Sequence, residues 1–260
     1  MMNVESLEKV GNSKFGSHFT KPLYGDYCFS NIPETIKKLL DAESNRCLPE
    51  SILKGLPQKY DKIVLFYIDA FGWKSMEQLL ETHPLLRRVE KEGVISKISS
   101  QFPSTTAPHV VSIHSGCPVG ESGIYEWYMY DPKLDSIISP LLFNFAGSAE
   151  RNTLQNAGLQ PGDLFPHRSL YKELKTENIT SFVYQSRDYT PSPVTESAFE
   201  GTQVLPFTSL AEVCVALLRN LKANEGPAYH FIYYDKIDSI VHQYGPESDF
   251  YHAEIRNCLN

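Results

Sequence analysis

Uninterrupted apolar runs mark the strands of this chain. Lys62–Ala70 (KIVLFYIDA) and Ala228–Asp235 (AYHFIYYD) are apolar at consecutive positions, which is typical of strands buried on both faces of a parallel sheet. Ile179–Tyr184 predicts a third strand, and Val94–Ser99 (VISKIS) predicts a fourth. Each run is short and is followed by a polar or periodic segment, so the strands are expected to alternate with helices.

Helical periodicity fills the segments between these runs. Residues 74–92 predict a helix interrupted near Pro84, and residues 208–224 predict an amphipathic helix. Shorter helices are expected between Pro103 and Gly116, over 168–177, and from Glu247 to Leu259. Alternating strands and helices predict an α/β fold with three layers, α/β/α, and a mostly parallel central sheet.

Local composition divides the chain into three parts. Residues 1–60 mix Gly, Ser, Asn and Pro around one helical patch at Glu34–Ala42, and we expect them to form an N-terminal extension. Residues 61–260 then form the main α/β domain. Within it, 117–168 is irregular and rich in Pro, Gly and Tyr, as expected of an insertion or a long active-site loop.

Charge and cysteine content exclude several functional classes. The formal net charge is -7 and no basic stripe is visible, so nucleic-acid binding is not expected. No stretch of about 18 apolar residues exists, so no membrane span is expected. The five cysteines are scattered without a CxxC pair, and no apolar run follows the first charges of the chain. These features favour a reducing, cytoplasmic location.

Polar residues follow the strand ends, where ligands gather in open parallel sheets. Asp69 closes the first apolar run, and Ser104-Thr105-Thr106 stands where the helix after Pro103 should begin. Taken alone, Asp69 suits a helix cap or an ion pair, and the hydroxyls suit N-capping. A hydroxyl at a helix N-terminus also faces partial positive charge that favours an alkoxide and binds phosphate oxygens, so a nucleophile is the alternative.

A second group of polar residues follows the run that ends at Asp235. Asp238 and His242 are four residues apart, so a helical turn places them on one face. A carboxylate and an imidazole together suit Zn²⁺ or Mn²⁺, whereas a plain surface pair is the alternative. Asp235 is a weaker ligand candidate because it lies nearer the strand.

Other common catalytic motifs are missing. The chain has no GxSxG, no GxxxxGK[ST] and no GxGxxG, which excludes the usual serine-hydrolase elbow, phosphate loop and dinucleotide fingerprint. His109, His114 and Cys117 are close in sequence, but their spacing fits no usual zinc pattern, so structural roles are expected for them.

Taken in order, the strand-end Asp, the segment FPSTTAP…SIHSG and the segment DKIDSIVHQYGP resemble the type I phosphodiesterase / nucleotide pyrophosphatase family. That family belongs to the alkaline phosphatase superfamily. The resemblance runs from about Lys62 to the C-terminus and is weak in the insertion. It implies an alkaline phosphatase-like catalytic domain that hydrolyses small phosphate esters or nucleotides.

The resemblance also implies roles for individual residues. Thr106 matches the family's threonine nucleophile, with Thr105 as the runner-up. Asp69 and Thr106 match the residues that touch one zinc ion, and Asp238 and His242 match ligands of the other. Two divalent metal ions are therefore expected, zinc first and manganese as the alternative. In the family, the threonine attacks phosphorus in line and a metal-bound water then releases the phosphate.

Two departures from the family pattern limit the prediction. The family places an Asn a few residues past its SHGI segment, where this chain has Tyr125, Glu126 and Trp127. The family also completes its metal sites with a DHG-like motif, and none follows His242. A domain truncated at the C-terminus is therefore expected, as a fragment, a split or frame-shifted gene, or a pseudoenzyme. Such a chain should bind metal weakly.

Three functions remain open at this stage. The first is a phosphodiesterase or nucleotide pyrophosphatase-like hydrolase. The second is a phosphomonoesterase, or a sulfate or phosphonate ester hydrolase, of the same superfamily. The third is an inactive remnant that binds phosphate or a nucleotide. The stretch Tyr125–Tyr130 (YEWYMY) suits either stacking on a nucleobase or simple packing, and the sequence does not indicate an oligomeric state.

Overall fold

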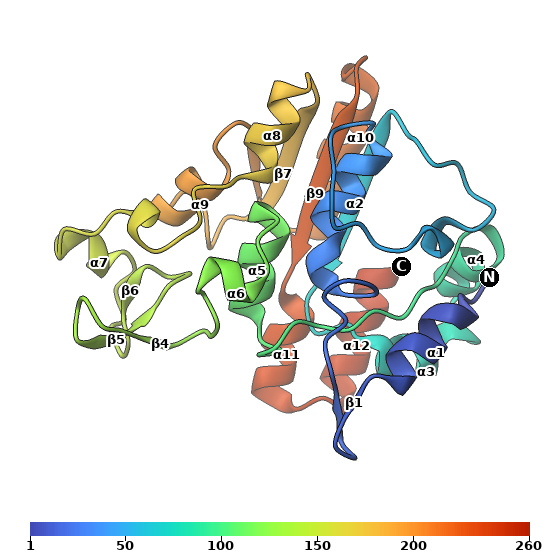
Figure 1. The fold of residues 1–260 in the computed structure, drawn as a ribbon, viewed down its shortest axis with the longest axis horizontal. Helices are drawn as coiled ribbons and strands as arrows, with labels where there is room; N and C mark the ends of the chain where they lie inside the picture. Colours follow the sequence, from blue (N-terminus) through green and yellow to red (C-terminus); the bar gives the residue numbers. More distant parts are fainter.

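A four-stranded parallel sheet forms the centre of the computed structural model, which describes residues 1–260 (Figure 1). Its strands lie in the order β3 (Lys62–Ile68), β9 (Ala228–Tyr234), β7 (Thr180–Ser186) and β8 (Gln203–Phe207), and each neighbouring pair is parallel. All seven residues of β9 are buried, because strands and helices surround it on every side. This burial explains why its sequence is apolar without alternation.

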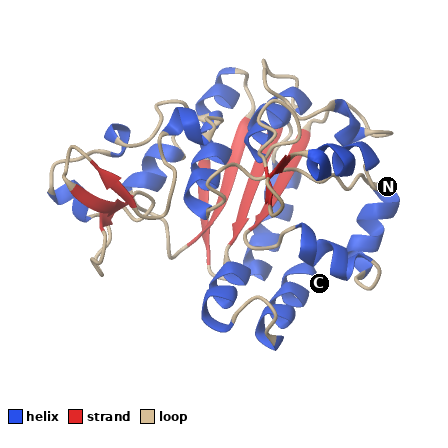
Figure 2. Ribbon diagram, turned by 60° about the horizontal axis from the view of Figure 1, so that its bottom comes forward, coloured by secondary structure: helices blue, strands red, loops and turns tan.

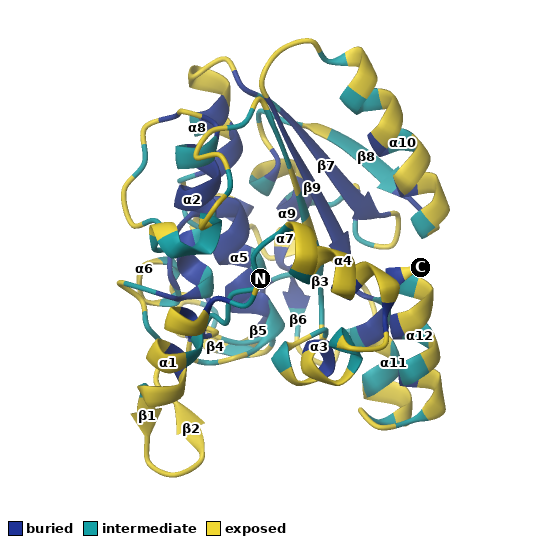
Figure 3. Ribbon diagram, turned by 90° about the vertical axis from the view of Figure 1, so that its right-hand side faces the viewer, coloured by how far each residue is buried: buried dark blue, intermediate teal, exposed yellow.

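Helices cover both faces of the sheet, which confirms the predicted three-layer α/β/α fold (Figure 3). α2 (Ile32–Leu39), α5 (Thr106–Ser115) and α8 (Leu170–Thr176) pack on one face, where the largest apolar cluster joins Ile113 and Leu174 to Phe231. α10 (Leu210–Ala223) covers the other face through Val213 and Leu217. The predicted interruption at Pro84 is also present, since α3 (Trp73–Leu80) and α4 (Pro84–Glu92) are separate helices.

Two more helices lie at the carboxyl end of the sheet. α11 (Lys236–Tyr244) begins directly after β9, and α12 (Asp249–Leu259) packs beside it. A third apolar cluster joins them to the ends of β3 and β9 and to α4, with Tyr234, Ile237 and Leu86 among its buried members. This packing holds α11 next to the carboxyl end of β3. None of the helices is long and apolar enough to span a membrane.

The first 60 residues, which we expected to form an extension, contribute to the core. Helix α2 supplies Ile36 and Leu40 to the largest apolar cluster. The remaining elements of this part are α1 (Val4–Asn12), the hairpin strands β1 (Lys14–Phe15) and β2 (Phe19–Thr20), and the 3₁₀ turns η1 (Phe29–Asn31) and η2 (Glu50–Leu53). The hairpin projects from the molecule, as Figures 1 and 3 show.

The segment 117–168 forms a small unit beside the main sheet (Figure 2). It contains helices α6 (Val119–Ser122) and α7 (Thr153–Asn156), the 3₁₀ turn η3 (Pro161–Asp163), and an antiparallel sheet of β4 (Met129–Asp131), β5 (Ser136–Ser139) and β6 (Asn144–Phe145). It has an apolar cluster of its own, which also includes Val194 of α9 (Pro193–Ala198). The segment is therefore packed rather than a plain loop.

One predicted strand is wrong, and one strand of the central sheet was not predicted. Val94–Ser99 forms only two isolated bridges, from Ile95 to Met2 and from Ser99 to Cys28. Each bridge joins this segment to one residue of the N-terminal part, and no strand pairs with it. The fourth strand of the sheet is instead β8, whose sequence QVLPF contains a proline.

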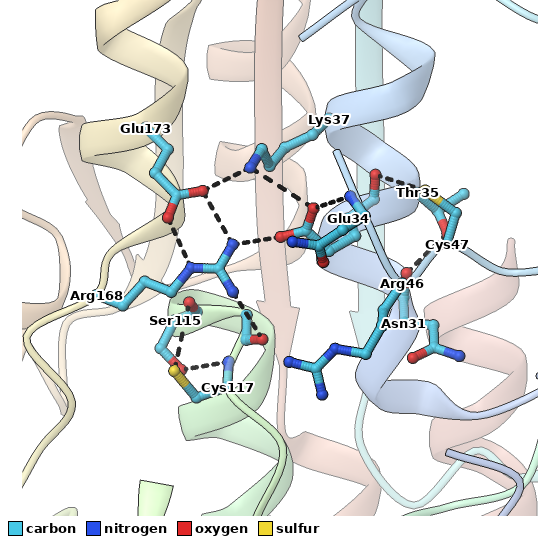
Figure 4. A network of polar contacts seen from close by, with 12 residues as sticks. Asn31, Glu34, Thr35, Lys37, Arg46, Cys47, Ser115, Cys117, Arg168 and Glu173 are labelled. Atoms are coloured by element: carbon cyan, nitrogen blue, oxygen red, sulfur yellow. Dashed lines mark hydrogen bonds and ion pairs between the residues drawn. The ribbon is translucent and has the colours of Figure 1, made fainter. Parts of the chain in front are cut away.

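A network of ion pairs joins α2, α8 and the end of α5 (Figure 4). Arg168 donates from Nε to Glu173 Oε1 at 2.6 Å, from Nη2 to Glu34 Oε1, and from Nη1 to the carbonyl of Gly116 at 3.3 Å. Lys37 Nζ lies 2.6 Å from Glu173 and 3.6 Å from Glu34. Gly116 ends α5 with a left-handed φ of 71°, so the network holds the C-terminal end of that helix.

Candidate active site

Asp69 lies at the carboxyl end of β3 and is held in place by its neighbours. Its backbone N–H donates to the carbonyl of Tyr234 at 2.9 Å, which extends the pairing of β3 with β9 by one residue. Its carboxylate accepts hydrogen bonds from Ala70 N at 3.0 Å and from the hydroxyl of Tyr233 at 2.6 Å. The orientation of the carboxylate therefore follows from the register of the two strands.

Thr106 is the first residue of α5, and its hydroxyl faces Asp69. Thr106 Oγ1 lies 3.4 Å from Asp69 Oδ2 and donates a hydrogen bond to it. Thr105 occupies the N-cap position, but its hydroxyl is buried and makes no hydrogen bond. Of the two predicted hydroxyls, the one at Thr106 thus contacts the strand-end carboxylate.

His109 supports the turn that presents Thr106. Its Nε2 accepts a hydrogen bond from Gln101 N at 2.9 Å, so its Nδ1 carries the proton and donates to Thr105 O at 2.7 Å. Burial lowers the pKa of the His109 imidazole, which keeps the ring neutral for both bonds. His114, farther along α5, is bound to the hydroxyl of Tyr171. Both histidines have structural partners.

Asp238 and His242 lie on one face of α11, which confirms the helical spacing predicted for them. His242 Nε2 is 3.6 Å from Asp238 Oδ2, and the His242 side chain is 81% exposed. Burial raises the pKa of the Asp238 carboxyl, and the nearby charges of Asp69 and Asp235 raise it further. The negative charges of Asp69 and Asp235 therefore act on the Asp238 carboxyl.

Tyr233 and Tyr189 are site residues that the sequence did not indicate. Burial and the charge of Asp69 raise the pKa of the Tyr233 phenol, so the hydroxyl remains protonated and donates to Asp69. Tyr189 OH donates to Asp235 Oδ2 at 2.5 Å, and burial raises the pKa of that phenol too. Asp235 is only 6% exposed, so it serves as the buried acceptor of Tyr189.

These side chains line one large cleft of about 1280 Å³ at the carboxyl end of the sheet. Asp69, Thr106, Asp238 and His242 all face it. Residues of the insertion form another part of its wall, among them Glu126, Trp127, Tyr128 and Arg151. The structure therefore brings together at one cleft the four residues that were predicted from three separate sequence segments.

The charge and donor set of the cleft suit cations better than a bare phosphate. Four carboxylates line it, from Asp69, Glu126, Asp235 and Asp238, against the single guanidinium of Arg151. Asp69 with Thr106, and Asp238 with His242, form two pairs of side chains that carry oxygen or nitrogen atoms of the kind that bind metal ions. No group of three or more His, Cys, Asp or Glu side chains is placed to hold a metal ion. Each pair is thus one ligand short of the three that catalytic zinc ordinarily takes.

Comparison with known proteins shows the family to which the chain belongs. A family model described as type I phosphodiesterase / nucleotide pyrophosphatase matches residues 63–258. The human ectonucleotide pyrophosphatase/phosphodiesterase family member 1 is 26% identical over 194 residues. That match covers 71% of this chain and 19% of the human protein.

Solved structures of murine ectonucleotide pyrophosphatase / phosphodiesterase 5 share the fold, with a TM-score of 0.55 and 18% identity. The match covers 76% of this chain and 49% of the murine chain. One of these structures is an inactive threonine-to-alanine variant in complex with AMP. The chain thus spans less than half the length of the relatives that it matches.

Proposed function

Because the chain belongs to the type I phosphodiesterase / nucleotide pyrophosphatase family, we propose that it hydrolyses phosphate diesters with Thr106 Oγ1 as the nucleophile. The contact between this hydroxyl and Asp69 Oδ2, at 3.4 Å, is the observation that carries the proposal. The inactive threonine-to-alanine variant of the murine neighbour also supports a threonine in this role. Among the two candidate hydroxyls, only that of Thr106 contacts a strand-end carboxylate.

The position of Thr106 suits attack on phosphorus. The first turn of α5 points unpaired backbone N–H groups and the positive end of the helix dipole toward the cleft, where they stabilise a phosphate oxygen. Asp69 Oδ2 accepts a hydrogen bond from the Thr106 hydroxyl and so orients Oγ1. A bond from Oγ1 to phosphorus then forms as the bond from phosphorus to the leaving oxygen breaks, and the hydroxyl proton reaches the leaving oxygen through solvent, which gives the free alcohol. Water cleaves the resulting phosphothreonine, releases the phosphate product and restores Thr106.

We propose that the reaction depends on divalent cations, zinc or manganese, held by Asp69 with Thr106 and by Asp238 with His242. When bound, such ions supply Lewis-acid stabilisation of the attacking and leaving oxygens. The negative charges of Asp69 and Asp235 raise the pKa of the Asp238 carboxyl. Because cations offset such an accumulation of negative charge, we expect them to bind here. Because each pair offers only two protein ligands, binding of metal by this chain is expected to be weak.

A nucleotide is the proposed substrate class. The cleft of about 1280 Å³ is large enough for a nucleotide, and Trp127 and Tyr128 offer aromatic surface on its wall. The complex of the murine neighbour with AMP supports the same class. If a monoester or a sulfate ester is instead cleaved faster than a diester by orders of magnitude, the superfamily assignment stands and the diester preference is wrong.

A second candidate function is binding without turnover. It is favoured by the incomplete ligand pairs, since no group of three metal-binding side chains is present. It predicts that AMP binds with similar affinity with and without added metal and that no phosphodiester is hydrolysed at high zinc or manganese.

Hydrolysis of bis(4-nitrophenyl) phosphate with added Zn²⁺ or Mn²⁺ tests the proposal. The Thr106→Ala variant should lose about 10³-fold or more in kcat/KM, because the nucleophile is removed. Thr105→Ala is the matched control and should retain activity within a few-fold, since the Thr105 hydroxyl makes no hydrogen bond. Activity that survives both Thr106→Ala and chelation of the metal would overturn the mechanism.

A further inference from the structure

A smaller cavity of about 210 Å³ adjoins the cleft along α5, and we call it the side cavity. The two spaces share part of their walls, at Val110, His114, Leu141, Val194 and Ala198. The other walls of the side cavity come from α9 and from the loop that precedes α8. A ligand in the cleft can therefore extend beside α5 toward this space.

The geometry of α5 sets the length of such a ligand. His114 lies eight residues after Thr106 on the same helix, which corresponds to about 12 Å at the usual rise per residue. A group bound in the side cavity thus sits about 12 Å from the phosphorus that Thr106 attacks. That distance suits a second unit of an extended ester, joined through the leaving alcohol.

Two side chains that line the side cavity, Ser169 and His114, have a hydrogen-bonding atom without a partner. Ser169 is only 7% exposed, and its hydroxyl makes no hydrogen bond. His114 is equally buried, and only its Nδ1 is bonded, to Tyr171 OH at 2.7 Å. A buried hydroxyl without a partner is costly, and a ligand that hydrogen-bonds to it would remove that cost.

Charges around the side cavity are already balanced. The guanidinium of Arg168 is bound to Glu173 and Glu34, as Figure 4 shows, and Lys172 pairs with Glu200 at 2.6 Å. Burial lowers the pKa of His114 to about 3, which keeps its imidazole neutral. Neither Arg168 nor Lys172 is therefore free to bind a second phosphate or carboxylate.

Together with the apolar walls from Val110 and Val194, these groups define the ligand chemistry. We propose that the side cavity binds a neutral, hydroxyl-bearing group, such as a sugar ring, on the alcohol half of the ester. The proposal deepens the function proposed above and rests on it, because it places the leaving group of that reaction. It makes α9 and the loop before α8 the determinants of leaving-group specificity.

Binding of methyl α-D-glucopyranoside to the full chain, measured by ligand-observed NMR or calorimetry, tests this inference. Ser197→Leu narrows the cavity from an exposed position on α9 and should weaken binding by about 10-fold or more. Glu196→Leu, the adjacent exposed residue outside the cavity, is the matched control and should bind like the parent. Ser169→Ala should weaken binding about 2- to 10-fold, as expected for one lost hydrogen bond.

The measurement is made in the Thr106→Ala variant as well, so that it does not depend on turnover. Glucoside binding that Ser197→Leu leaves unchanged, or that is absent at high millimolar concentration, would overturn the inference. Stronger binding of inorganic phosphate, abolished by Ser197→Leu, would also overturn it by showing an anion site. Because neither readout uses hydrolysis, a failed glucoside experiment with an active enzyme rejects the side cavity alone.

Discussion

The carboxylate of Asp69 accepts three hydrogen bonds, from Ala70 N, Tyr233 OH and Thr106 Oγ1. Two of these donors, Tyr233 and Thr106, share the oxygen Oδ2. The phenol at 2.6 Å is the closer of the two and comes from the neighbouring strand β9. It therefore fixes the direction of the carboxylate, whereas the longer contact leaves Thr106 free to bond to a substrate.

We predict that Tyr233→Phe lowers metal affinity or kcat/KM by about 10- to 100-fold, because residues that orient a metal ligand have effects of this size. Zinc titration and diester hydrolysis measure the two quantities. Tyr67→Phe is the matched control, since Tyr67 lines the same cleft and its hydroxyl makes no hydrogen bond. Equal effects of the two substitutions would show that loss of a buried hydroxyl, rather than the contact with Asp69, is responsible.

The buried imidazole of His230 predicts a pH dependence of stability. Burial, with a smaller effect of the Lys62 charge, lowers its pKa to about 4, compared with about 6.5 in an unfolded chain. The unfolded state therefore binds the proton first. The stability contributed by the neutral ring is complete above pH 6.5 and is lost as the pH falls toward 4.

Urea unfolding at pH 7 and pH 5 checks this dependence. His230→Phe keeps a ring stacked on Phe182 and removes the titrating group. The parent should lose about 1–2 kcal/mol more than the variant between these two pH values. Parallel losses in parent and variant would contradict the assignment to His230.

At this scale, strand ends, helical spacing and the family resemblance together pointed to Asp69, Thr106, Asp238 and His242, and these four side chains line one cleft. It did not select Tyr233 from among the tyrosines of its strand. That choice depends on the register in which Tyr67 pairs with Tyr233, which places the phenol next to the strand end. Register comes from the contacts of both strands with the whole core, and so local sequence does not determine it.

At the scale of elements, two strands show where local patterns are insufficient. Val94–Ser99 contains three apolar residues among its six, but only isolated bridges form because no strand lies alongside. β8 has Pro206 in its sequence, which argues against an interior strand. The structure resolves the contradiction, since β8 is the edge strand and pairs only with β7. Both outcomes depend on neighbours that are distant in sequence.

The network around Arg168 predicts a stability effect that joins three helices. Glu34 is 1% exposed, so removing its guanidinium partner leaves a buried charge. Arg168→Met should lower the free energy of unfolding by roughly 2–3 kcal/mol, with Lys37 at 3.6 Å from Glu34 limiting the loss. Denaturant unfolding measures the change.

The matched control is Lys59→Met. Lys59 pairs with Asp41 at the surface, where both side chains are more than half exposed, and the expected loss is under about 1 kcal/mol. A loss for Arg168→Met no larger than that of the control would mean that the network stabilises little. In that case the C-terminal end of α5 would be held by apolar packing alone.

At the scale of the whole molecule, the arrangement of layers decides which segments belong to the catalytic unit. The sequence predicted residues 1–60 as an extension because their composition is irregular and only one helical patch is present. Yet α2 packs in the same layer as α5 and α8, against one face of the sheet. Thr106 belongs to α5 and therefore to this layer. We therefore propose that these residues form part of the catalytic domain.

Deletion of residues 1–60 tests this proposal. It removes Ile36 and Leu40 from the largest apolar cluster and leaves Ile113 and Tyr229 without cover on that side. Burial of several such side chains, at about 1.5–3 kcal/mol each, contributes a free energy comparable to the whole net stability of a typical domain, about 5–15 kcal/mol. The shortened protein should therefore show no cooperative thermal unfolding.

A smaller deletion separates the role of α2 from that of the segment in general. Lys21 N donates to Ser13 O at 2.9 Å, so the hairpin 14–20 can be replaced by two glycines without moving its ends. Phe15 and Phe19 in this hairpin are 73% and 67% exposed, and so its removal should leave Tm within a few degrees. If the 1–60 deletion unfolds as cooperatively as the hairpin deletion, residues 61–260 are a domain by themselves, and the network that joins Glu34 to Arg168 is not needed to hold the helix that begins with Thr106.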